Sequence, residues 1–270
     1  MVLKKEEWIV SNRFDGKVVL ITGAASGLGQ ATALQVAKEG AKLSLVDLNS
    51  GALEETKSKI AEAAPNAEVI LITANVADEK AVESYVNETV EKFGRIDGFF
   101  NNAGIEGKQN PTEDYGIEEF QKVVDINLNG VFYGMKYVLK VMKEQGSGSI
   151  VNTASVGGIR GVGNQSGYAA SKHGVVGLTR NSGIEYGQYG VSIKAIAPGA
   201  IMTPMVEGSL KQMDPDNWEE VGKQFVEPNP MKRFGKPEEV GYLAAFLLSD
   251  QANFINATVI PIDGGQSYKY

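Results

Sequence analysis

The sequence of 270 residues has no cysteine and a single histidine, His173. Without cysteine, the chain forms no disulfide, uses no thiolate nucleophile and offers no sulfur ligand to zinc. One imidazole with no second histidine argues against a metal site, and no G-x-S-x-G motif precedes a distant histidine as a hydrolase triad requires. We therefore expect no bound metal and a structural role for His173.

Long apolar runs and clusters of basic residues are also missing. No run approaches the ~18 residues of a membrane-spanning helix, and residues 1–14 combine charges with a very short apolar patch, unlike an export signal. The net charge is -7, and Lys and Arg are spread along the chain, which leaves no electrostatic footprint for nucleic acid. We expect a cytoplasmic protein with no nucleic-acid or membrane partner, in which residues 1–14 form a short extension.

What the chain does have is an alternation of short β-branched runs with longer segments of helical period. The expected strands are residues 18–21, 43–46, 69–72, 96–100, 150–152, 191–197 and 258–262. The expected helices are residues 27–39, 52–63, 79–93, 117–144, 168–186 and 237–248. Such alternation predicts βαβ units with right-handed crossovers. The expected fold is α/β: a single-domain Rossmann-type doubly wound parallel sheet of seven strands, with helices on both faces, over residues 1–270.

The segment 203–234 departs from this alternation. It mixes apolar side chains such as Met205 and Trp218 with breakers such as Pro215 and Pro228. Long insertions of this kind in compact domains are usually functional or disordered, and a mobile lid over a substrate pocket is the favoured interpretation. The alternative is an ordinary long connection with two surface helices.

A glycine-rich turn follows the first expected strand, in the stretch T-G-A-A-S-G-L-G. Its first glycine permits the turn, the second lets backbone N–H groups approach a pyrophosphate, and the third allows close packing where a helix begins. Alone such a loop is more often a plain turn, but its place at the start of a βαβ series predicts a nucleotide site. The loop residues expected at the cofactor are Gly23, Ser26, Gly27, Leu28 and Gly29.

Asp47 ends the second expected strand, 18 residues after Gly29. A carboxylate at this place accepts hydrogen bonds from the ribose hydroxyls and repels a 2′-phosphate, and no Lys or Arg lies nearby to reverse that effect. NAD is therefore favoured over NADP, with Leu48 beside the acid; the alternative is that Asp47 caps the next helix. Asn75 and Val76, after the third strand, are placed to contact adenine.

Tyr168 and Lys172 are four residues apart on an expected helix, so both side chains lie on one face. Lowering the tyrosine pKa from about 10 to about 7 requires about 4 kcal/mol. An ammonium at ~4 Å in an effective dielectric of ~20 supplies about that much. We expect Tyr168 to act as a general acid/base, with Ser155, which follows the fifth strand, holding the same carbonyl oxygen. The sequence therefore predicts hydride exchange between a nicotinamide and a carbonyl or alcohol carbon.

The motif N-N-A-G at residues 101–104 closes the fourth expected strand. Its small residues allow the backbone to lie against a cofactor, so Asn102, Ala103 and Gly104 are cofactor candidates. A simple turn from strand to loop is the alternative.

In this order and spacing, T-G-x-x-x-G-x-G, N-N-A-G, a serine and Y-x-x-x-K resemble the short-chain dehydrogenase/reductase family, over residues 17–265. The resemblance implies that Tyr168 passes the proton, Lys172 also holds the nicotinamide ribose, Ser155 orients the carbonyl and Asn127 anchors a water relay behind Lys172. It further implies cofactor contacts at Pro198, Gly199, Ile201 and Thr203. Asn75 departs from the family, which often has Asp there.

The resemblance also implies a homotetramer, in which helices 117–144 and 168–186 pair across one interface and the tail 261–270 joins another. Segments 105–113, 157–170 and 197–207 resemble family members that reduce cyclic diketones. The expected substrate-pocket residues are Gly157, Ile159, Val162, Gln165, Met202 and Met205.

The expected function is therefore an NAD(H)-dependent oxidoreductase that reduces a ketone, favoured to be a cyclic ketone or diketone, to a secondary alcohol and runs the reverse reaction. Two alternatives stay open. One is a reductase of 3-oxoacyl thioesters on an acyl carrier protein, and the other is a non-catalytic NAD(H)-binding sensor.

Overall fold

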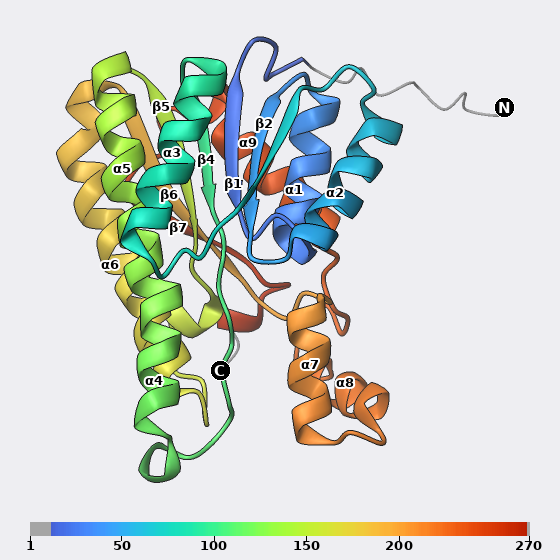
Figure 1. Cartoon of the computed structure of the whole chain (residues 1–270). Coiled ribbons are helices and arrows are strands. Elements are labelled where there is room, and N and C mark those ends of the chain that lie inside the picture. Colours follow the sequence, from blue (N-terminus) through green and yellow to red (C-terminus); the bar gives the residue numbers. More distant parts are fainter. Residues whose placement is uncertain (1–11, 269–270) are drawn as a thin grey trace, which may run out of the picture.

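A computed structural model describes residues 12–268 and shows one parallel sheet in the order β3-β2-β1-β4-β5-β6-β7 (Figure 1). The strands are β1 (Val18–Thr22), β2 (Lys42–Asp47), β3 (Val69–Thr73), β4 (Gly98–Asn101), β5 (Gly148–Thr153), β6 (Val191–Pro198) and β7 (Thr258–Ile262). The predicted seven-stranded doubly wound fold is confirmed. The strand order reverses between β1 and β4, and at such a point the loops part to leave a crevice beyond the carboxyl ends of the strands.

Helices cover both faces of the sheet because successive strand residues point to opposite sides. Ile21 and Phe100 face α1 (Gly27–Lys38), α2 (Ser50–Ala63) and α9 (Pro237–Leu248). Their neighbours Leu20 and Phe99 face α3 (Glu79–Phe93), α5 (Gly130–Gln145) and α6 (Ser166–Tyr186). Central strands such as β1, β4 and β6 are thus buried on both sides, which explains their continuous apolar runs, whereas the edge strands β3 and β7 are only partly buried.

The ends of α3 show how local sequence sets a helix. Asp78 caps its start, with the carboxylate accepting from the backbone N–H of Lys80 at 2.9 Å. Gly94 ends it in the left-handed conformation at φ 79°, which glycine adopts without steric cost. The predicted range 79–93 agrees with the observed helix.

The predicted helix 117–144 is interrupted, and this is a correction. It consists of α4 (Ile117–Val124), one π turn (Asp125–Asn129) and α5. A π turn holds an extra residue per turn and is common at functional sites. Here it directs the buried side chain of Asn127 toward the loop after β4, where it bonds to the backbone of Ile105.

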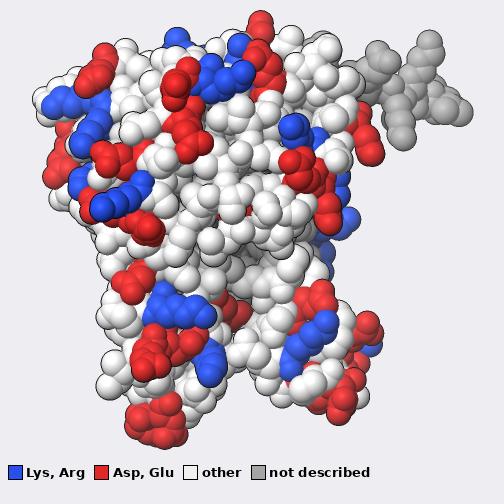
Figure 2. All heavy atoms as spheres, viewed as in Figure 1, with Lys and Arg blue, Asp and Glu red and all other residues white. Residues whose placement is uncertain are grey.

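The predicted lid segment 203–234 contains α7 (Pro204–Met213) and α8 (Trp218–Val226). The ring of Phe225 stacks on Phe234 with centroids 6.3 Å apart, which ties α8 to the returning chain. In Figure 1 these two helices project beyond the sheet on one side of a gap, and α4 projects on the other. Figure 2 shows the surface recessed between the two projections. Motion of the segment stays a prediction.

The extension predicted for residues 1–14 reaches too far into the chain. Residues 1–11 lie outside the described part, but Phe14 is a core residue, only 2% exposed, and Arg13 makes two hydrogen bonds of 2.5 and 2.6 Å to the carboxylate of Glu39. Residues 13 and 14 therefore belong to the domain. Residues 269–270 of the predicted interface tail also lie outside the described part. Within residues 12–268, no helix is long and apolar enough to cross a membrane.

Candidate active site

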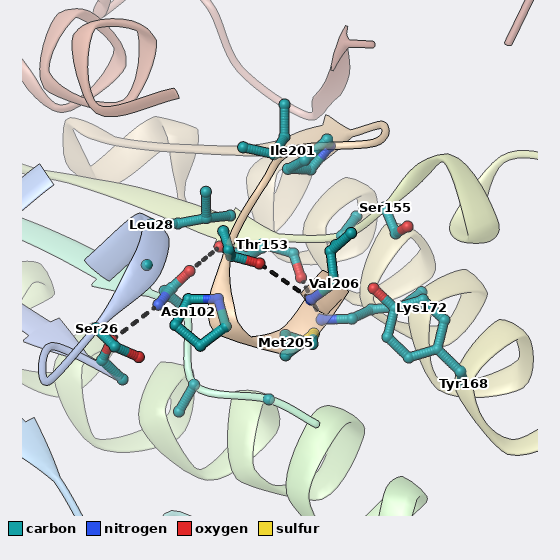
Figure 3. Close-up of a pocket in the computed structure, with 18 of the residues that line it drawn as sticks. Ser26, Leu28, Asn102, Thr153, Ser155, Tyr168, Lys172, Ile201, Met205 and Val206 are labelled. Atoms are coloured by element: carbon teal, nitrogen blue, oxygen red, sulfur yellow. Dashed lines mark hydrogen bonds between the residues drawn. The ribbon is translucent and has the colours of Figure 1, made fainter. Parts of the chain in front are cut away.

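A cavity of about 310 Å³ opens at the carboxyl ends of β1, β4, β5 and β6 (Figure 3). Its wall brings together most of the residues selected from the sequence: Gly23, Ser26, Gly27, Leu28, Asp47, Asn102, Ala103, Gly104, Ser155, Tyr168, Lys172, Pro198, Gly199, Ile201, Thr203 and Met205. The other selected residues do not line it: Gly29, Leu48, Asn75, Val76, Asn127, Gly157, Ile159, Val162, Gln165 and Met202. Figure 3 shows Ser26 and Leu28 at one end and Tyr168 and Lys172 at the other.

The glycine-rich loop shapes the first end of this cavity. A side chain at Gly29 would collide with the carbonyl oxygen of Gly23, and Gly23 itself has φ 66°, where other residues are strained. Helix α1 begins at Gly27 with no side chain bonded to its first amides. Those free N–H groups and the positive end of the helix dipole suit a phosphate.

Asp47 stands beside this loop, and its two oxygens are oriented by backbone amides. Oδ2 accepts from the N–H of Ala25 at 3.1 Å, and Oδ1 accepts from the N–H of Asn49 at 3.1 Å. Asn49, rather than Asp47, caps α2 by accepting from Ala52. The alternative that Asp47 serves as the helix cap is therefore wrong, and its carboxylate lines the cavity.

Asn75 and Val76 lie farther out. The carboxamide oxygen of Asn75 accepts from the N–H of Ala77 at 3.0 Å, and the side chain is exposed beyond β3. The backbone of Val76 packs against the start of α5 at Gly130. Leu48 is 65% exposed. Contact of these residues with an adenosine stays a prediction.

Thr22 and Asn102 tie the strand ends beneath the cavity. The hydroxyl oxygen of Thr22 accepts from the N–H groups of Asn102 at 2.9 Å and Ala103 at 3.1 Å. The carboxamide oxygen of Asn102 in turn accepts from the hydroxyl of Thr153 at 3.1 Å (Figure 3). These hydrogen bonds connect the carboxyl ends of β1, β4 and β5 and so hold the floor of the cavity in place. Thr153 was not selected from the sequence, although it ends the fifth strand.

Lys172 is a buried cation at the second end, 3% exposed. Its Nζ donates to the carbonyl oxygen of Thr153 at 2.7 Å, and burial lowers its pKa to about 8. The carboxamide of Asn127 exchanges two hydrogen bonds of 2.8 Å with the backbone of Ile105. A Cβ built on Gly104 would lie 3.0 Å from Oδ1 of Asn127 and 3.5 Å from Nζ of Lys172. Asn127 and Lys172 therefore both approach Gly104. Lys172 lines the cavity, and Asn127 lies just outside it.

The pKa of Tyr168 corrects a prediction. Burial raises it to about 12, although a hydrogen bond with Ser155 lowers it in part. Lys172 does not bring it near 7, because its Nζ lies 5.7 Å from the centroid of the phenol ring and is engaged by the carbonyl of Thr153. Tyr168 is therefore a protonated acid at neutral pH.

Ser155 follows β5 and caps a single turn (Val156–Gly158), with its hydroxyl oxygen accepting from the N–H of Gly157 at 3.0 Å. Its own proton is the one used in the hydrogen bond with Tyr168, since a hydrogen bond that lowers the pKa of a phenol is donated to the phenol oxygen. A carbonyl oxygen in the cavity can take this proton in place of the phenol oxygen. With Tyr168, Ser155 presents two O–H groups at this end of the cavity, as a carbonyl oxygen needs.

Some of the predicted substrate-pocket residues lie near Tyr168 or the cavity, and others lie away from both. A Cβ built on Gly157 would meet Val162 at 3.1 Å and the Tyr168 ring at 3.4 Å, so Gly157 lies between Val162 and the phenol ring. Met205, on α7, lines the cavity. Ile159 instead packs among the apolar side chains of the α3, α5 and α6 face, and Met202 donates its N–H to Gly235 at 3.0 Å.

Glu106 is a buried acid near Tyr168 that the sequence reasoning did not select. Its carboxylate accepts from the carboxamide of Gln165 and from the hydroxyl of Ser209 at 3.0 Å, and Ser209 also accepts from Gln109 at 2.5 Å. Burial raises the pKa of Glu106, and its charge contributes to the raised pKa of Tyr168. Glu106 therefore joins the loop after β4, the segment before α6 and helix α7 near the phenol.

His173 is exposed on α6, with Nδ1 2.9 Å from the carbonyl oxygen of Ala169 four residues earlier. In the part of the chain that the structure describes, no three His, Asp or Glu side chains are grouped as a metal would require.

Residues 23–267 match the family model described as enoyl-(acyl carrier protein) reductase. A curated relative, levodione reductase of Leifsonia aquatica, is 64% identical over 260 residues, which are 96% of this chain and 97% of the relative. The chain belongs to the short-chain dehydrogenase/reductase family. It is thus an oxidoreductase of a family that binds a nicotinamide cofactor.

Other members of the short-chain dehydrogenase/reductase family extend the comparison. Cyclohexanol dehydrogenase of Acinetobacter sp. (strain SE19) is 40% identical, over 97% of this chain and all of the relative. The crystal structure of levodione reductase superimposes with a TM-score of 0.94, covering 95% of this chain and 100% of that one. The structure of NAD+-bound xylitol dehydrogenase, at 35% identity, has a TM-score of 0.89, covering 93% of this chain and 99% of that one.

Proposed function

We propose that this protein is an NAD(H)-dependent oxidoreductase that reduces a cyclic ketone or diketone to a secondary alcohol and catalyses the reverse oxidation. One observation carries the proposal: a single cavity holds Asp47 at one end and Ser155, Tyr168 and Lys172 at the other. The similarity to levodione reductase and cyclohexanol dehydrogenase supports a ring substrate.

The first end of the cavity fits a dinucleotide. Gly23 and Gly29 leave the backbone bare where side chains would collide, and the first turn of α1 offers free amides to a pyrophosphate. Asp47 suits the ribose hydroxyls and repels a 2′-phosphate, which supports NAD over NADP. Bound NADH supplies a hydride to the carbonyl carbon. The residues at this end would hold the dinucleotide through their backbone more than through their side chains.

In the proposed reduction, Tyr168 donates its phenolic proton to the carbonyl oxygen while the hydroxyl of Ser155 holds that oxygen. A proton donor must be protonated before it acts, and with a pKa raised to about 12 by burial, Tyr168 meets that condition at neutral pH. Lys172 places a buried charge beside the phenol and the bound ribose, and Asn127 braces the backbone at Ile105 behind it. Oxidation of the alcohol requires the phenolate, so we expect it to gain as the pH rises.

The charges around the mouth of the recess argue against the alternative of a substrate bound to an acyl carrier protein. Carboxylates gather at the tips of both projections that flank the recess (Figure 2). The exposed acids of these segments include Glu113, Asp114 and Glu118 around the start of α4 and Glu219 on α8. Lysines on the second projection are paired with glutamates. Because like charges across an interface are repulsive, an acidic carrier would be disfavoured at this mouth.

We also propose an oligomeric state, a location in the cell and a role for the 203–234 segment. Exposed apolar side chains lie on α4, α5 and α6 at Ile117, Phe132 and Ile184, and on the opposite flank at Tyr242 and Phe254. Exposed apolar side chains on both flanks support a homotetramer of single-domain subunits, built on the helix pair and the tail expected from the sequence. We also place the enzyme in the cytoplasm and give the 203–234 segment the role of a lid, linked to Glu106 through Ser209.

Activity assays test the proposed reaction. The purified enzyme would be assayed with cyclic diketones, linear ketones and 3-oxoacyl thioesters, each with NADH and with NADPH. We expect the largest kcat/KM for a cyclic diketone with NADH. A larger kcat/KM for an acyl thioester with NADPH would support the carrier-protein alternative and contradict the proposal.

A further inference from the structure

A buried threonine outside the cavity is bonded to the back of the glycine-rich loop. Thr56 lies in α2 and is 0% exposed. Its hydroxyl oxygen is 3.1 Å from the carbonyl oxygen of Ala24, 3.3 Å from that of Ala25 and 3.1 Å from that of Ala52. The hydroxyl has a single proton to share among these three carbonyls, and those of Ala24 and Ala52 are the nearest.

Gln30 completes the contact from α1. Its Nε2 donates to the hydroxyl oxygen of Thr56 at 2.7 Å and to the carbonyl oxygen of Ala25 at 3.2 Å. The ammonium of Lys59 lies 2.9 Å from the other carboxamide atom, and because an ammonium only donates, that atom is Oε1. The orientation of the Gln30 carboxamide is thereby fixed, with both Nε2 protons directed at Thr56 and the loop.

The same loop residue contacts Asp47. The carbonyl of Ala24, which accepts from Thr56 at 3.1 Å, and the N–H of Ala25 belong to one peptide group, and this N–H donates to Oδ2 of Asp47 at 3.1 Å. Gln30 holds the next carbonyl, that of Ala25, at 3.2 Å. A shift of the peptide between Ala24 and Ala25 would release one of the two hydrogen bonds that orient the Asp47 carboxylate. The chain of contacts therefore runs from the buried face of α2 to the acid that faces the ribose end of the cavity.

We propose that Thr56, together with Gln30, is a positioning residue for coenzyme selectivity, which holds the peptide between Ala24 and Ala25 so that Asp47 faces the ribose. The inference rests on the proposed NAD(H) function. It assigns no contact with the coenzyme to Thr56. Loss of its hydroxyl weakens binding of NADH more than binding of NADPH, because a displaced carboxylate both loses the ribose hydroxyls and repels a 2′-phosphate less.

The test compares Thr56→Val, which keeps the shape and removes the hydroxyl, with the wild type. Dissociation constants for NADH and NADPH are measured by calorimetry, and kcat is measured at saturating NADH. We expect the NADH constant to rise about five- to tenfold, as the loss of one to two hydrogen bonds implies, and the NADPH constant to change less than about twofold. The kcat stays within about twofold, since Ser155 and Tyr168 lie at the other end.

Three further variants make the test specific. Thr56→Ser restores the hydroxyl and should restore the NADH preference. Ser58→Ala removes an exposed hydroxyl of the same helix, bonded to Glu54, and should change neither constant. If Thr56→Val does not fold, as judged by circular dichroism, Gln30→Met removes the same support from α1 and should lower the NADH preference.

The outcomes separate the inference from the proposed function. Equal weakening of both coenzymes, with an unchanged NADH preference, indicates a general structural role for Thr56 and contradicts the inference alone. A wild-type enzyme that binds NADPH as tightly as NADH contradicts the proposed coenzyme and the inference with it.

Discussion

The two ends of the cavity are built differently. The coenzyme end consists of backbone, with glycines where side chains would collide and carbonyls held from behind by the buried Thr56. The substrate end is lined by side chains from distant segments, such as Ser155, Lys172 and Met205. Outside this lining, Glu106 is bonded to Ser209, 103 residues later in the sequence. Helix α7 also covers this end of the cavity, and the side chain of its Met205 is 41% exposed.

The difference shows where specificity resides. A backbone cradle recognises what all dinucleotides share, so its geometry tolerates little change, and discrimination is left to one carboxylate, Asp47. A wall of side chains can be altered one contact at a time without disturbing the sheet. We therefore expect changes at the two ends to affect different kinetic constants.

The largest effect should come from Tyr168→Phe, which removes the proton donor and leaves the ring. We expect kcat to fall about a thousandfold, as for the loss of a general acid, while the dissociation constant for NADH changes less than about threefold. Stopped-flow turnover and NADH fluorescence titration measure the two constants. Tyr186→Phe, on the same helix, is the matched control and should keep full turnover.

If Tyr168→Phe kept substantial activity, the substrate end would not contain the proton donor. The comparison between a binding end and a reacting end would then fail.

Gly29→Ala should damage the coenzyme end instead. The added methyl group collides with the carbonyl oxygen of Gly23, and overpacking of this kind costs about 1–3 kcal/mol. We expect NADH binding to weaken about 10- to 100-fold, measured by calorimetry. Gly51→Ala is the control, since its added Cβ would meet only Oδ1 of Asn49 at 3.6 Å. Unchanged NADH affinity in Gly29→Ala would show that the loop does not bind the pyrophosphate.

A smaller effect is expected from Ser209→Ala at the substrate end. The variant loses the hydrogen bonds that connect α7 to Glu106 and Gln109 in the segment after β4. We expect the KM for the ketone to rise about fivefold, as for one lost hydrogen bond, with NADH affinity unchanged. Steady-state kinetics measure both, and Gln212→Ala, an exposed change on the same helix, is the control. An increase confined to the KM for NADH would contradict the division between the two ends.

Much of the fold could be predicted from sequence because buried parallel strands are continuous apolar runs between amphipathic helices. The errors are local. Ile96 was expected to begin the fourth strand, but its N–H donates to the side chain of Gln145 at 2.9 Å and pairing begins at Gly98. The π turn around Asn127 was also missed, since it depends on a contact with Ile105 that helical period does not reveal.

The site shows the same limit. Motifs at strand ends could be placed because the topology brings those ends together. Glu106 could not, since an acid in a loop is usually exposed and its partners Gln165 and Ser209 are distant in sequence. For Tyr168, spacing predicted that Lys172 would be near, but burial and the competing carbonyl of Thr153 decide its pKa.

The central claim is that Asp47 makes the coenzyme end selective for NAD(H), and calorimetric titration without substrate tests it most directly. We predict that the wild-type enzyme binds NADH at least about tenfold more tightly than NADPH, and that Asp47→Ala brings the two constants within about threefold. The NADH preference then differs between the two proteins by at least about 0.7 kcal/mol. Equal or tighter binding of NADPH by the wild type would contradict the account.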